Sequence, residues 1–301
     1  MTNTVSSDFK SGFLALTGRP NAGKSSLINS VVGEKVAITS NVSQTTRRRV
    51  RGILTTSHMQ LVLVDTPGLH KPKDVLGEEL NRVAMSSIED VDAVAFLADL
   101  SKPIGRGDRW IADRLKVLDI PLICVLTKKD KVTEDIVAEQ VEEAIRLADW
   151  DALICLSAKT GYNVGAFVDE CERLLPEGPM WFPPDSTSDS DLELIIAELV
   201  REKALHDFHD EIPHSIGVSV DSIEDDGGIV RIEATVLTER ESQKAMVIGK
   251  GGRAVKRIGS AARKELEDIL GAKVHLALSV KARPGWRSDM AQLERFGYAG
   301  D

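Results

Sequence analysis

The feature that most restricts the fold of this chain is a glycine-rich segment of the form GxxxxGKS, Gly18-Arg19-Pro20-Asn21-Ala22-Gly23-Lys24-Ser25. An apolar run at 13–17 precedes it, and a helical pattern at 25–32 follows it. Glycines let the backbone curl, so that its N–H groups surround phosphates at the N-terminus of a helix. Lys24 would then reach the β- and γ-phosphates of a nucleotide, and Ser25, followed by Ser26, would ligate Mg²⁺. The alternative is a glycine-rich turn that binds nothing.

The first 175 residues alternate between strand-like and helix-like segments, which is typical of an α/β fold with a mostly parallel sheet and helices on both faces. Several strands are nearly continuous apolar runs, as expected where both faces are covered. The second and third strands are separated only by residues 56–59, so we expect a hairpin and one antiparallel edge strand. The expected strands are 13–17, 49–55, 60–65, 93–98, 122–127 and 152–157, and the expected helices are 25–32, 78–87, 106–118, 134–148 and 165–174.

Two segments would complete a phosphate and magnesium site. The third strand ends in Asp65-Thr66-Pro67-Gly68, where a carboxylate is suited to support Mg²⁺ and the Gly68 N–H to sense a γ-phosphate. Upstream lies Gln44-Thr45-Thr46-Arg47, where a threonine hydroxyl would bind Mg²⁺. Thr46 is favoured over Thr45, and a plain Thr-rich loop is the alternative. We predict Lys24, Thr46 and Gly68 as catalytic groups, and Ser25, Thr46 and Asp65 as magnesium ligands.

Two later loops predict that the bound base is guanine. Thr127-Lys128-Lys129-Asp130 follows the apolar run 122–126. A carboxylate at Asp130 would accept hydrogen bonds from the N1–H and N2–H₂ edge of guanine, which adenine lacks, and leaving a buried acceptor unpaired is costly. Thr127 stands where this motif usually has asparagine, so we expect a weaker hold on the base. Ser157-Ala158-Lys159 matches a loop whose backbone contacts the guanine oxygen. GTP and GDP are the expected ligands.

The amino-acid composition of the sequence changes near residue 176. Residues 176–191 are rich in Pro, Ser and Asp and have no periodicity, which predicts an interdomain linker. We expect a nucleotide-binding domain at 1–178, a linker at 179–191 and a second domain at 192–301. That domain should hold a helix at 192–206, a hairpin around Asp225-Asp226-Gly227-Gly228, two helices joined by a glycine loop, and a strand at 273–281.

The glycine loop lies in Val247–Ile258, which has the form helix, GxxG, helix. This is the centre of a KH domain, whose GxxG loop clamps a nucleic-acid backbone while a groove reads about four nucleotides. Between Lys244 and Arg287 there are 11 Lys/Arg and three Asp/Glu, in a chain of net charge −9. The order of strands and helices indicates the type II arrangement. The alternative is a helix connection with a solvated basic face. The predicted RNA-binding residues are Ile248, Gly249, Lys250, Gly251, Gly252, Arg253, Lys256 and Arg257.

The remaining features exclude some classes of protein. No apolar run approaches the ~18 residues that span a bilayer, and the polar N-terminus is not that of a signal peptide. Cys124, Cys155 and Cys171 are scattered, which predicts buried thiols in a reducing compartment. A cytoplasmic protein is expected. Trp286 lies in a basic tail, where it would either stack on RNA or pack on the domain. Trp181 and Phe182 are expected to pack between domains.

The motifs GRPNAGKS, QTTR, DTPGLH, TKKD, SAKTG and VIGKGGRAVKRIG resemble, over essentially the whole chain, those of the Era family, bacterial GTPases of small ribosomal subunit assembly. The resemblance implies a P-loop GTPase domain followed by a small α+β type II KH domain. It implies Mg²⁺-dependent binding and hydrolysis of GTP. It also implies GTP-gated binding to the 3′-terminal region of small-subunit ribosomal RNA, and peripheral association with the inner face of the cell membrane. We expect a monomer.

One position predicts slow hydrolysis. Leu69 follows the DTPG segment where Ras-like GTPases have the glutamine that orients the attacking water. Intrinsic turnover should therefore be slow, or depend on a water held by backbone groups, a monovalent cation or a partner. Asn21 resembles the asparagine that coordinates K⁺ in some related GTPases, and a K⁺ site is the hypothesis that follows. An alternative function is a GTPase regulator that acts mainly through protein or membrane partners. A phosphotransferase is disfavoured, because it needs no guanine-reading loop.

Overall fold

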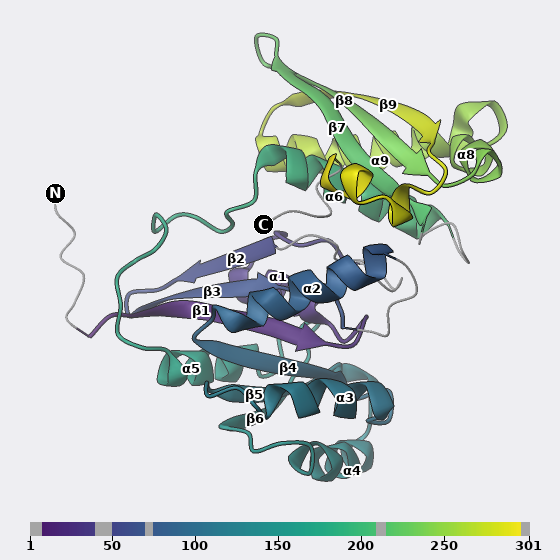
Figure 1. Cartoon of the computed structure of the whole chain (residues 1–301). Helices are drawn as coiled ribbons and strands as arrows, with labels where there is room; N and C mark the ends of the chain where they lie inside the picture. The colour runs from purple at the N-terminus through teal and green to yellow at the C-terminus, as the bar shows by residue number, and fades with distance from the viewer. Residues whose placement is uncertain (1–7, 40–49, 70–74, 209–214, 296–301) are drawn as a thin grey trace, which may run out of the picture. The chain divides into compact units, whose positions relative to one another are not determined.

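The computed structural model describes residues 8–39, 50–69, 75–208 and 215–295 of the 301-residue chain. These residues form two compact units (Figure 1). The first holds residues 8–39, 50–69 and 80–189, and the second is built mainly from residues 190–208 and 215–295. The predicted segment with Thr45 and Thr46 lies outside the described residues.

The first unit contains one six-stranded sheet in the order β2-β3-β1-β4-β5-β6. Every neighbouring pair is parallel except β2 and β3, which form the predicted hairpin, from Val50 opposite Asp65 to Thr55 opposite Gln60. The predicted α/β class is therefore confirmed. The strands are β1 (Lys10–Gly18), β2 (Val50–Thr55), β3 (Met59–Asp65), β4 (Ala93–Asp99), β5 (Leu122–Thr127) and β6 (Ala152–Cys155).

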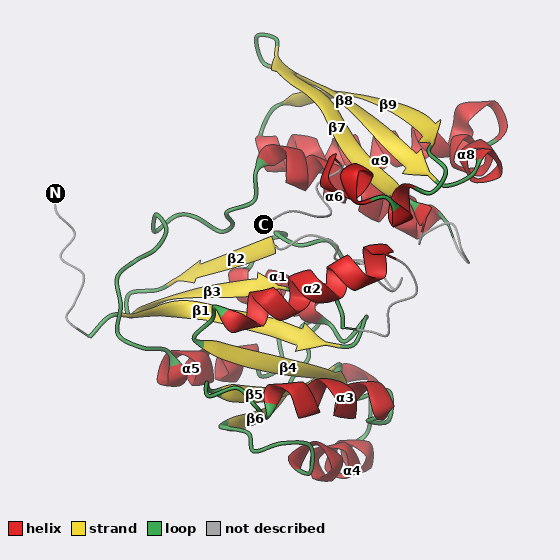
Figure 2. Cartoon of the chain, viewed as in Figure 1, coloured by secondary structure: helices red, strands yellow, loops and turns green. Residues whose placement is uncertain are grey.

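Helices cover both faces of this sheet (Figure 2). Helices α1 (Lys24–Val32) and α5 (Val164–Leu174) pack on one face, and α2 (Val75–Glu89), α3 (Arg106–Leu115) and α4 (Glu134–Ile145) pack on the other. Strand β4 serves both layers, because Ala95 and Leu97 join the first cluster while Val94 and Phe96 join the second. Burial on both faces explains why this strand is apolar at successive positions rather than at alternate ones.

Some predicted boundaries differ from the observed ones. Helix α2 begins at Val75 and ends at Glu89, extending beyond the predicted 78–87 at both ends. Its residues Leu76, Leu80, Ala84 and Ile88 are buried and recur every four positions, and Ala84 and Ile88 belong to the core cluster on this face of the sheet. Helices α3 and α4 end earlier than predicted, at Leu115 and Ile145, and a turn follows each of them.

The segment predicted as a linker is bound along the first unit. Its backbone makes hydrogen bonds with two strands: the Ser11 N–H donates to the Pro176 carbonyl at 3.0 Å, and the Ile53 N–H donates to the Thr187 carbonyl at 2.9 Å. The Arg51 guanidinium pairs with Asp189 at 2.6 Å. This part of the chain therefore follows a defined path, although its sequence has no periodicity.

The side chain of Gln60 holds the middle of this segment. Its Oε1 accepts hydrogen bonds from the N–H groups of Trp181 (2.7 Å) and Phe182 (2.9 Å), and its Nε2 donates to the Phe182 carbonyl at 2.9 Å. The Trp181 ring lies 5.9 Å from the Phe13 ring, and the residue is 56% exposed. Trp181 and Phe182, expected to pack between domains, are held against the first unit by these contacts.

Replacing Gln60 by the apolar Met should release this segment. The part-buried backbone groups of Trp181 and Phe182 would lose the partners that the buried Gln60 side chain supplies, so we expect a loss of about 2–4 kcal/mol in unfolding free energy, measured in urea by circular dichroism. Elastase cleavage within 179–189 should accelerate in parallel. Gln292→Met is the matched control, because the side chain of Gln292 bonds to Asp289 in its own turn. Equal cleavage of Gln60→Met and wild type would contradict the prediction.

The second unit has a three-stranded sheet in the order β7-β8-β9. Strands β7 (Gly217–Asp225) and β8 (Ile229–Thr238) form the predicted hairpin, with a bulge between Val220 and Ser222, and β9 (Lys273–Ala282) is parallel to β8. Helices α6 (Leu192–Asp207) and α9 (Arg253–Leu270) pack on one face of this sheet, and α8 (Glu241–Ile248) follows β8. The predicted α+β arrangement is confirmed.

The C-terminal part of this unit folds back on the domain. It contains a 3₁₀ turn (Trp286–Ser288) and α10 (Met290–Arg295). The Trp286 ring is fully buried, and its Nε1–H donates to the Ser215 carbonyl at 3.3 Å. Of the two expectations for Trp286, packing on the domain is therefore correct.

The other sequence-based expectations concern the membrane and the thiols. None of the helices that the structure describes is long and apolar enough to cross a membrane. Cys124 and Cys171 are buried, Cys155 is half-buried, and all three are free thiols. Burial raises the pKa of the Cys124 and Cys171 thiols, so both stay protonated at neutral pH.

Candidate nucleotide site and RNA-binding loop

Most of the predicted nucleotide motifs lie at one edge of the first sheet. The glycine-rich loop follows β1, the Asp65–Gly68 segment follows β3, and Thr127–Asp130 follows β5. Strand β1 lies between β3 and β4, so the chain connections diverge on either side of it. In open α/β sheets the carboxyl edge at such a point is where ligands bind. The fold therefore brings together segments that are far apart in the chain.

The glycine-rich loop has the geometry expected for phosphate binding. Gly18 adopts φ +148°, and a Cβ there would lie 2.4 Å from the Leu97 carbonyl oxygen, so no larger residue fits. Lys24 is only 6% exposed, and its Nζ donates to the carbonyls of Gly18 (3.3 Å) and Arg19 (3.4 Å). Burial lowers the pKa of the Lys24 amine, and the nearby Asp65 carboxylate opposes that shift. An anionic phosphate beside this amine would stabilise its charged form.

Two of the three predicted magnesium ligands are in contact. The Ser25 Oγ donates to Asp65 Oδ2 at 2.6 Å, and Asp65 is fully buried at the end of β3. The adjacent Thr66 hydroxyl donates to the Leu16 carbonyl at 2.7 Å, which joins the ends of β3 and β1. A hydroxyl and a carboxylate are the hard oxygen groups that Mg²⁺ prefers, so this pair fits the ion.

The start of the glycine-rich loop is held from two sides. A Cβ on Gly68 would lie 2.9 Å from the Pro20 nitrogen, so Gly68 and Pro20 are in direct backbone contact. On the other side, the Arg19 guanidinium pairs with Asp108 Oδ2 at 3.1 Å, and the same oxygen accepts the Gly105 N–H at the start of α3. Asp108 was not predicted as a site residue. Its only sequence signal is an acidic residue in the first turn of a helix.

Leu69 is 2% exposed and belongs to the core cluster under α2 and α3. Its side chain therefore serves packing, and no polar group at this position is available to orient a water. This agrees with the sequence-based interpretation of the residue.

Thr127 connects the base loop to the phosphate loop. Its Oγ1 lies 2.7 Å from the Ala22 carbonyl oxygen and 3.2 Å from the Ala98 carbonyl oxygen, so its one proton goes mainly to Ala22. The Lys128 Nζ makes a second connection, to the Asn21 carbonyl and to Asp99, both at 2.7 Å. At the position where asparagine is usual, this threonine therefore connects the base loop to the phosphate loop by a hydrogen bond.

Asp99, at the end of β4, is a further site residue that was not predicted from the sequence. Its burial favours the neutral form, but hydrogen bonds from Lys128 and Ser101 hold the pKa of the carboxyl below its usual range. Asp99 thereby fixes Lys128, whose backbone has φ +60°.

The predicted guanine-reading carboxylate is oriented by the last loop. The Ser157 Oγ donates to Asp130 Oδ1 at 2.6 Å, and this bond holds the pKa of Asp130 below its usual range. Asp130 is therefore ionised at neutral pH and keeps its second oxygen as an acceptor for a base. Lys129 lies beside it, paired with Glu134 at 2.8 Å, and Ala158 and Lys159 follow Ser157.

The predicted RNA-binding loop joins α8 to α9 through the 3₁₀ turn Lys250–Gly252. Gly251 and Gly252 have φ +63° and +76°, and apart from their chain neighbours no atom of the described residues lies within 4 Å of where their Cβ atoms would be. The backbone is thus open to close approach by a ligand. Lys250, Arg253 and Lys256 are exposed around it, whereas Arg257 pairs with Asp207 at 2.9 Å. The charge of Arg257 is therefore partly compensated.

Comparison with known proteins identifies the families to which the two units are similar. A model described as 50S ribosome-binding GTPase matches residues 13–128, and a KH domain model matches residues 211–287. Together with the fold, these matches define the class of the chain as a P-loop GTPase with a C-terminal KH domain. GTPase Era of Staphylococcus epidermidis is 42% identical over 295 residues, which cover 98% of this chain and 99% of the relative. GTPase Era of Staphylococcus haemolyticus is equally similar. The chain belongs to the Era family of GTPases.

Two solved structures have the same fold over 97% of this chain and 100% of theirs, each with a TM-score of 0.94 and 36% identity. One is a single-residue variant of Aquifex aeolicus Era bound to GDP and AlF₄⁻. The other is Era in complex with MgGDPNP and nucleotides 1506–1542 of 16S ribosomal RNA.

Removing the Thr127 hydroxyl should weaken nucleotide binding. In Thr127→Val the Ala22 carbonyl loses its donor and the two loops lose a connection, so we expect GTP and GDP to bind about 5- to 30-fold more weakly. Isothermal titration calorimetry would measure both affinities. Thr133→Val is the matched control, because Thr133 caps α4 without a side-chain hydrogen bond. If Thr127→Val binds GTP and GDP as tightly as wild type does, the hydrogen bond from Thr127 to the Ala22 carbonyl does not support nucleotide binding.

Proposed function

We propose that this protein is a GTP-binding and GTP-hydrolysing switch that binds small-subunit ribosomal RNA near its 3′ end and acts in small ribosomal subunit assembly. The observation that carries the proposal is the pairing of Ser25 with Asp65 and of Ser157 with Asp130 at one sheet edge, in a chain that also has an open GxxG loop. The RNA and Mg²⁺–nucleotide complex of the similar Era structure supports it.

In this proposal the nucleotide is held by three groups of residues. Residues Gly18 to Ser26 surround the phosphates, and Asp65 to Gly68 face the γ-phosphate and Mg²⁺. Thr127 to Asp130 and Ser157 to Lys159 hold guanine, with Asp130 accepting from its N1–H and N2–H₂. Ser25, Thr46 and Asp65 support Mg²⁺, which would neutralise charge developing on the phosphates. Lys24 and the Gly68 N–H stabilise the same charge.

Hydrolysis should be slow unless a cation or partner assists, because Leu69 is buried in the core. We propose that K⁺ bound near Asn21 assists. With nucleotide and Mg²⁺ in excess, phosphate release should be about tenfold faster in potassium than in sodium buffer, a barrier difference of ~1.4 kcal/mol. Asn21→Asp should alter this ratio, whereas Thr133→Val should keep it. Equal rates in the two buffers would exclude the K⁺ site while leaving the GTPase assignment intact.

We propose that nucleotide state controls RNA binding. The γ-phosphate and Mg²⁺ would order the loops that contain Thr46 and Gly68, and hydrolysis would release them. The functional division is a GTPase domain at 1–178, a linker at 179–191 and an RNA-binding domain at 192–301. RNA would contact Ile248 to Arg253 and also Lys256 and Arg257. We further propose a cytoplasmic monomer that associates peripherally with the inner face of the cell membrane, as the family resemblance implies.

The decisive test is fluorescence anisotropy with an oligonucleotide of the 3′-terminal small-subunit ribosomal RNA. Binding should be tighter with a non-hydrolysable GTP analogue than with GDP. Gly251→Asp places a carboxylate where the RNA backbone approaches, so it should weaken binding by about 10- to 100-fold. Lys250→Glu with Arg253→Glu should also lower the salt dependence of binding.

Glu241→Gln, in the exposed first turn of α8, is the control for a helix substitution outside the loop. Equal affinity in the two nucleotide states would refute the coupling. No RNA binding in any state would favour the alternative, a GTPase regulator that acts through protein or membrane partners.

A further inference from the structure

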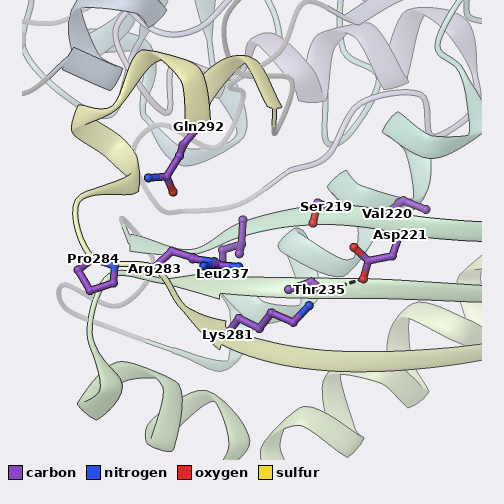
Figure 3. Close-up of a pocket in the computed structure, with 9 residues that line it drawn as sticks. All are labelled: Ser219, Val220, Asp221, Thr235, Leu237, Lys281, Arg283, Pro284 and Gln292. Atoms are coloured by element: carbon purple, nitrogen blue, oxygen red, sulfur yellow. Dashed lines mark hydrogen bonds between the residues drawn. The ribbon is translucent and has the colours of Figure 1, made fainter.

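A second polar site lies on the KH unit, on the face of the β7-β8-β9 sheet that α6 and α9 do not cover. It is a groove of about 500 Å³ near the ends of β8 and β9 (Figure 3). Strands β7, β8 and β9 form its floor, and Gln292 of α10 lies on one side. Its volume falls within the range of about 300–1,000 Å³ that is typical of small-ligand sites.

The hydrogen bonds on the floor of the groove show which polar groups donate and which accept. The Thr235 Oγ1 donates to Asp221 Oδ2 at 2.6 Å. Thr235 and Ser279 lie 2.8 Å apart, and since the proton of Thr235 is already used, Ser279 is the donor in that pair. Both hydroxyl protons therefore point along the floor, and Asp221 presents carboxylate lone pairs to the groove. The floor thus offers acceptors for a ligand's N–H groups.

The rim supplies positive charge. Lys281 and Arg283 both line the groove, and neither forms an ion pair with another residue in the part of the chain that the structure describes. Other cations of the same sheet are compensated, since Arg231 pairs with Asp226 at 3.0 Å and Lys273 with Glu267 at 3.8 Å. Two uncompensated cations beside an accepting carboxylate suit a ligand that carries an anion and N–H donors together.

The groove also has apolar surface. Leu237 and Pro284 line it, and because Leu237 is only 2% exposed, the carbon surface open to a flat ring is mainly that of the exposed Pro284. An RNA nucleotide has this combination of groups. Its phosphate would meet Lys281 and Arg283, and the exocyclic amine of cytosine, or the N1–H and N2–H₂ edge of guanine, would meet Asp221. Adenine also has an amine, but uracil offers only one N–H.

We propose that this groove is a second RNA subsite, which binds one unpaired nucleotide whose base carries an exocyclic amine, beyond the segment held at the GxxG loop; the proposal rests on the RNA-binding function proposed above. Helix α8 separates the two sites, and its eight residues span about 12 Å. One strand of RNA can therefore reach both. A KH groove reads only about four nucleotides, so a longer RNA has nucleotides left for another surface.

The test uses the full chain with a GTP analogue and three fluorescent single-stranded RNAs. One has four nucleotides, to fill the GxxG site alone. Two have twelve nucleotides and share those four, but the other eight are rich in G and C in one and all U in the other. The double variant Lys281→Ala/Arg283→Ala should bind the G/C-rich RNA about 5- to 30-fold more weakly, with a salt slope smaller by about 0.7 for each phosphate that the variant no longer neutralises. Binding of the short RNA should not change.

Asp221→Asn tests the base contact separately. Asparagine still accepts the Thr235 hydroxyl, but it replaces one carboxylate oxygen by an N–H₂ donor. The preference for the G/C-rich RNA over the all-U RNA should therefore fall by about tenfold. Arg231→Ala/Lys273→Ala is the matched control, because it removes the same charge from the same sheet, outside the groove. Thermal unfolding would confirm that all variants remain folded.

The possible outcomes distinguish failure of the subsite from failure of the proposed function. If the control weakens binding of the G/C-rich RNA as much as Lys281→Ala/Arg283→Ala does, the effect is general electrostatics and the subsite is refuted. If GMP or CMP alone competes fully with the long RNA, the groove is a mononucleotide site and not part of an RNA surface. If wild type and Gly251→Asp both bind no RNA, the proposed function fails, and the subsite fails with it. If Gly251→Asp loses binding while the groove variants bind as wild type does, the function stands and the subsite alone is refuted.

Discussion

Burial of a parallel sheet between two layers of helices is the constraint on which the nucleotide site depends. Because β1, β3, β4 and β5 run in one direction and are covered on both faces, their loops can carry polar chemistry only at the edge where the strands end. There, short hydrogen bonds connect the loops. Thr127 binds the Ala22 carbonyl, Lys128 binds Asp99, and Ser25 binds Asp65. These hydrogen bonds hold the described parts of the site in place through the protein's own contacts.

The segment that joins the two units has an unusual physical character for a linker. Its Pro, Ser and Asp content is that of a flexible connection, but Gln60 supplies an acceptor and donors in the middle, and β2 supplies an N–H near its end. The bound end, near Thr187, lies against the strand that begins directly after residues 40–49, the part of the chain with Thr46.

The KH unit separates its polar groups onto two surfaces. The GxxG loop exposes backbone and cations at the end of α8, and the open face of the sheet exposes the groove around Asp221. Counting charges treats all lysines and arginines of this unit alike, but the ion pairs show that some of them are neutralised and others are not. Arg257 and Arg231 are compensated by Asp207 and Asp226, whereas Lys281 and Arg283 have no such partner among the described residues. Surface charge on this unit is therefore concentrated at particular sites.

Features that depend on local chemistry were predictable from the sequence: the glycine-rich turn before α1, the DTPG and TKKD loops, the β2–β3 hairpin and the GxxG loop. In each, neighbouring residues determine both the backbone geometry and the chemistry. Gln60, Asp99 and Asp108 were not predictable, because each acts on residues far away in the chain. For the same reason the sequence did not decide whether Trp286 stacks on RNA or packs on the domain, since only folding of the tail brings it to the Ser215 carbonyl. The groove at Asp221 exists only where three strands and α10 meet, and such long-range proximity leaves no pattern in a single sequence.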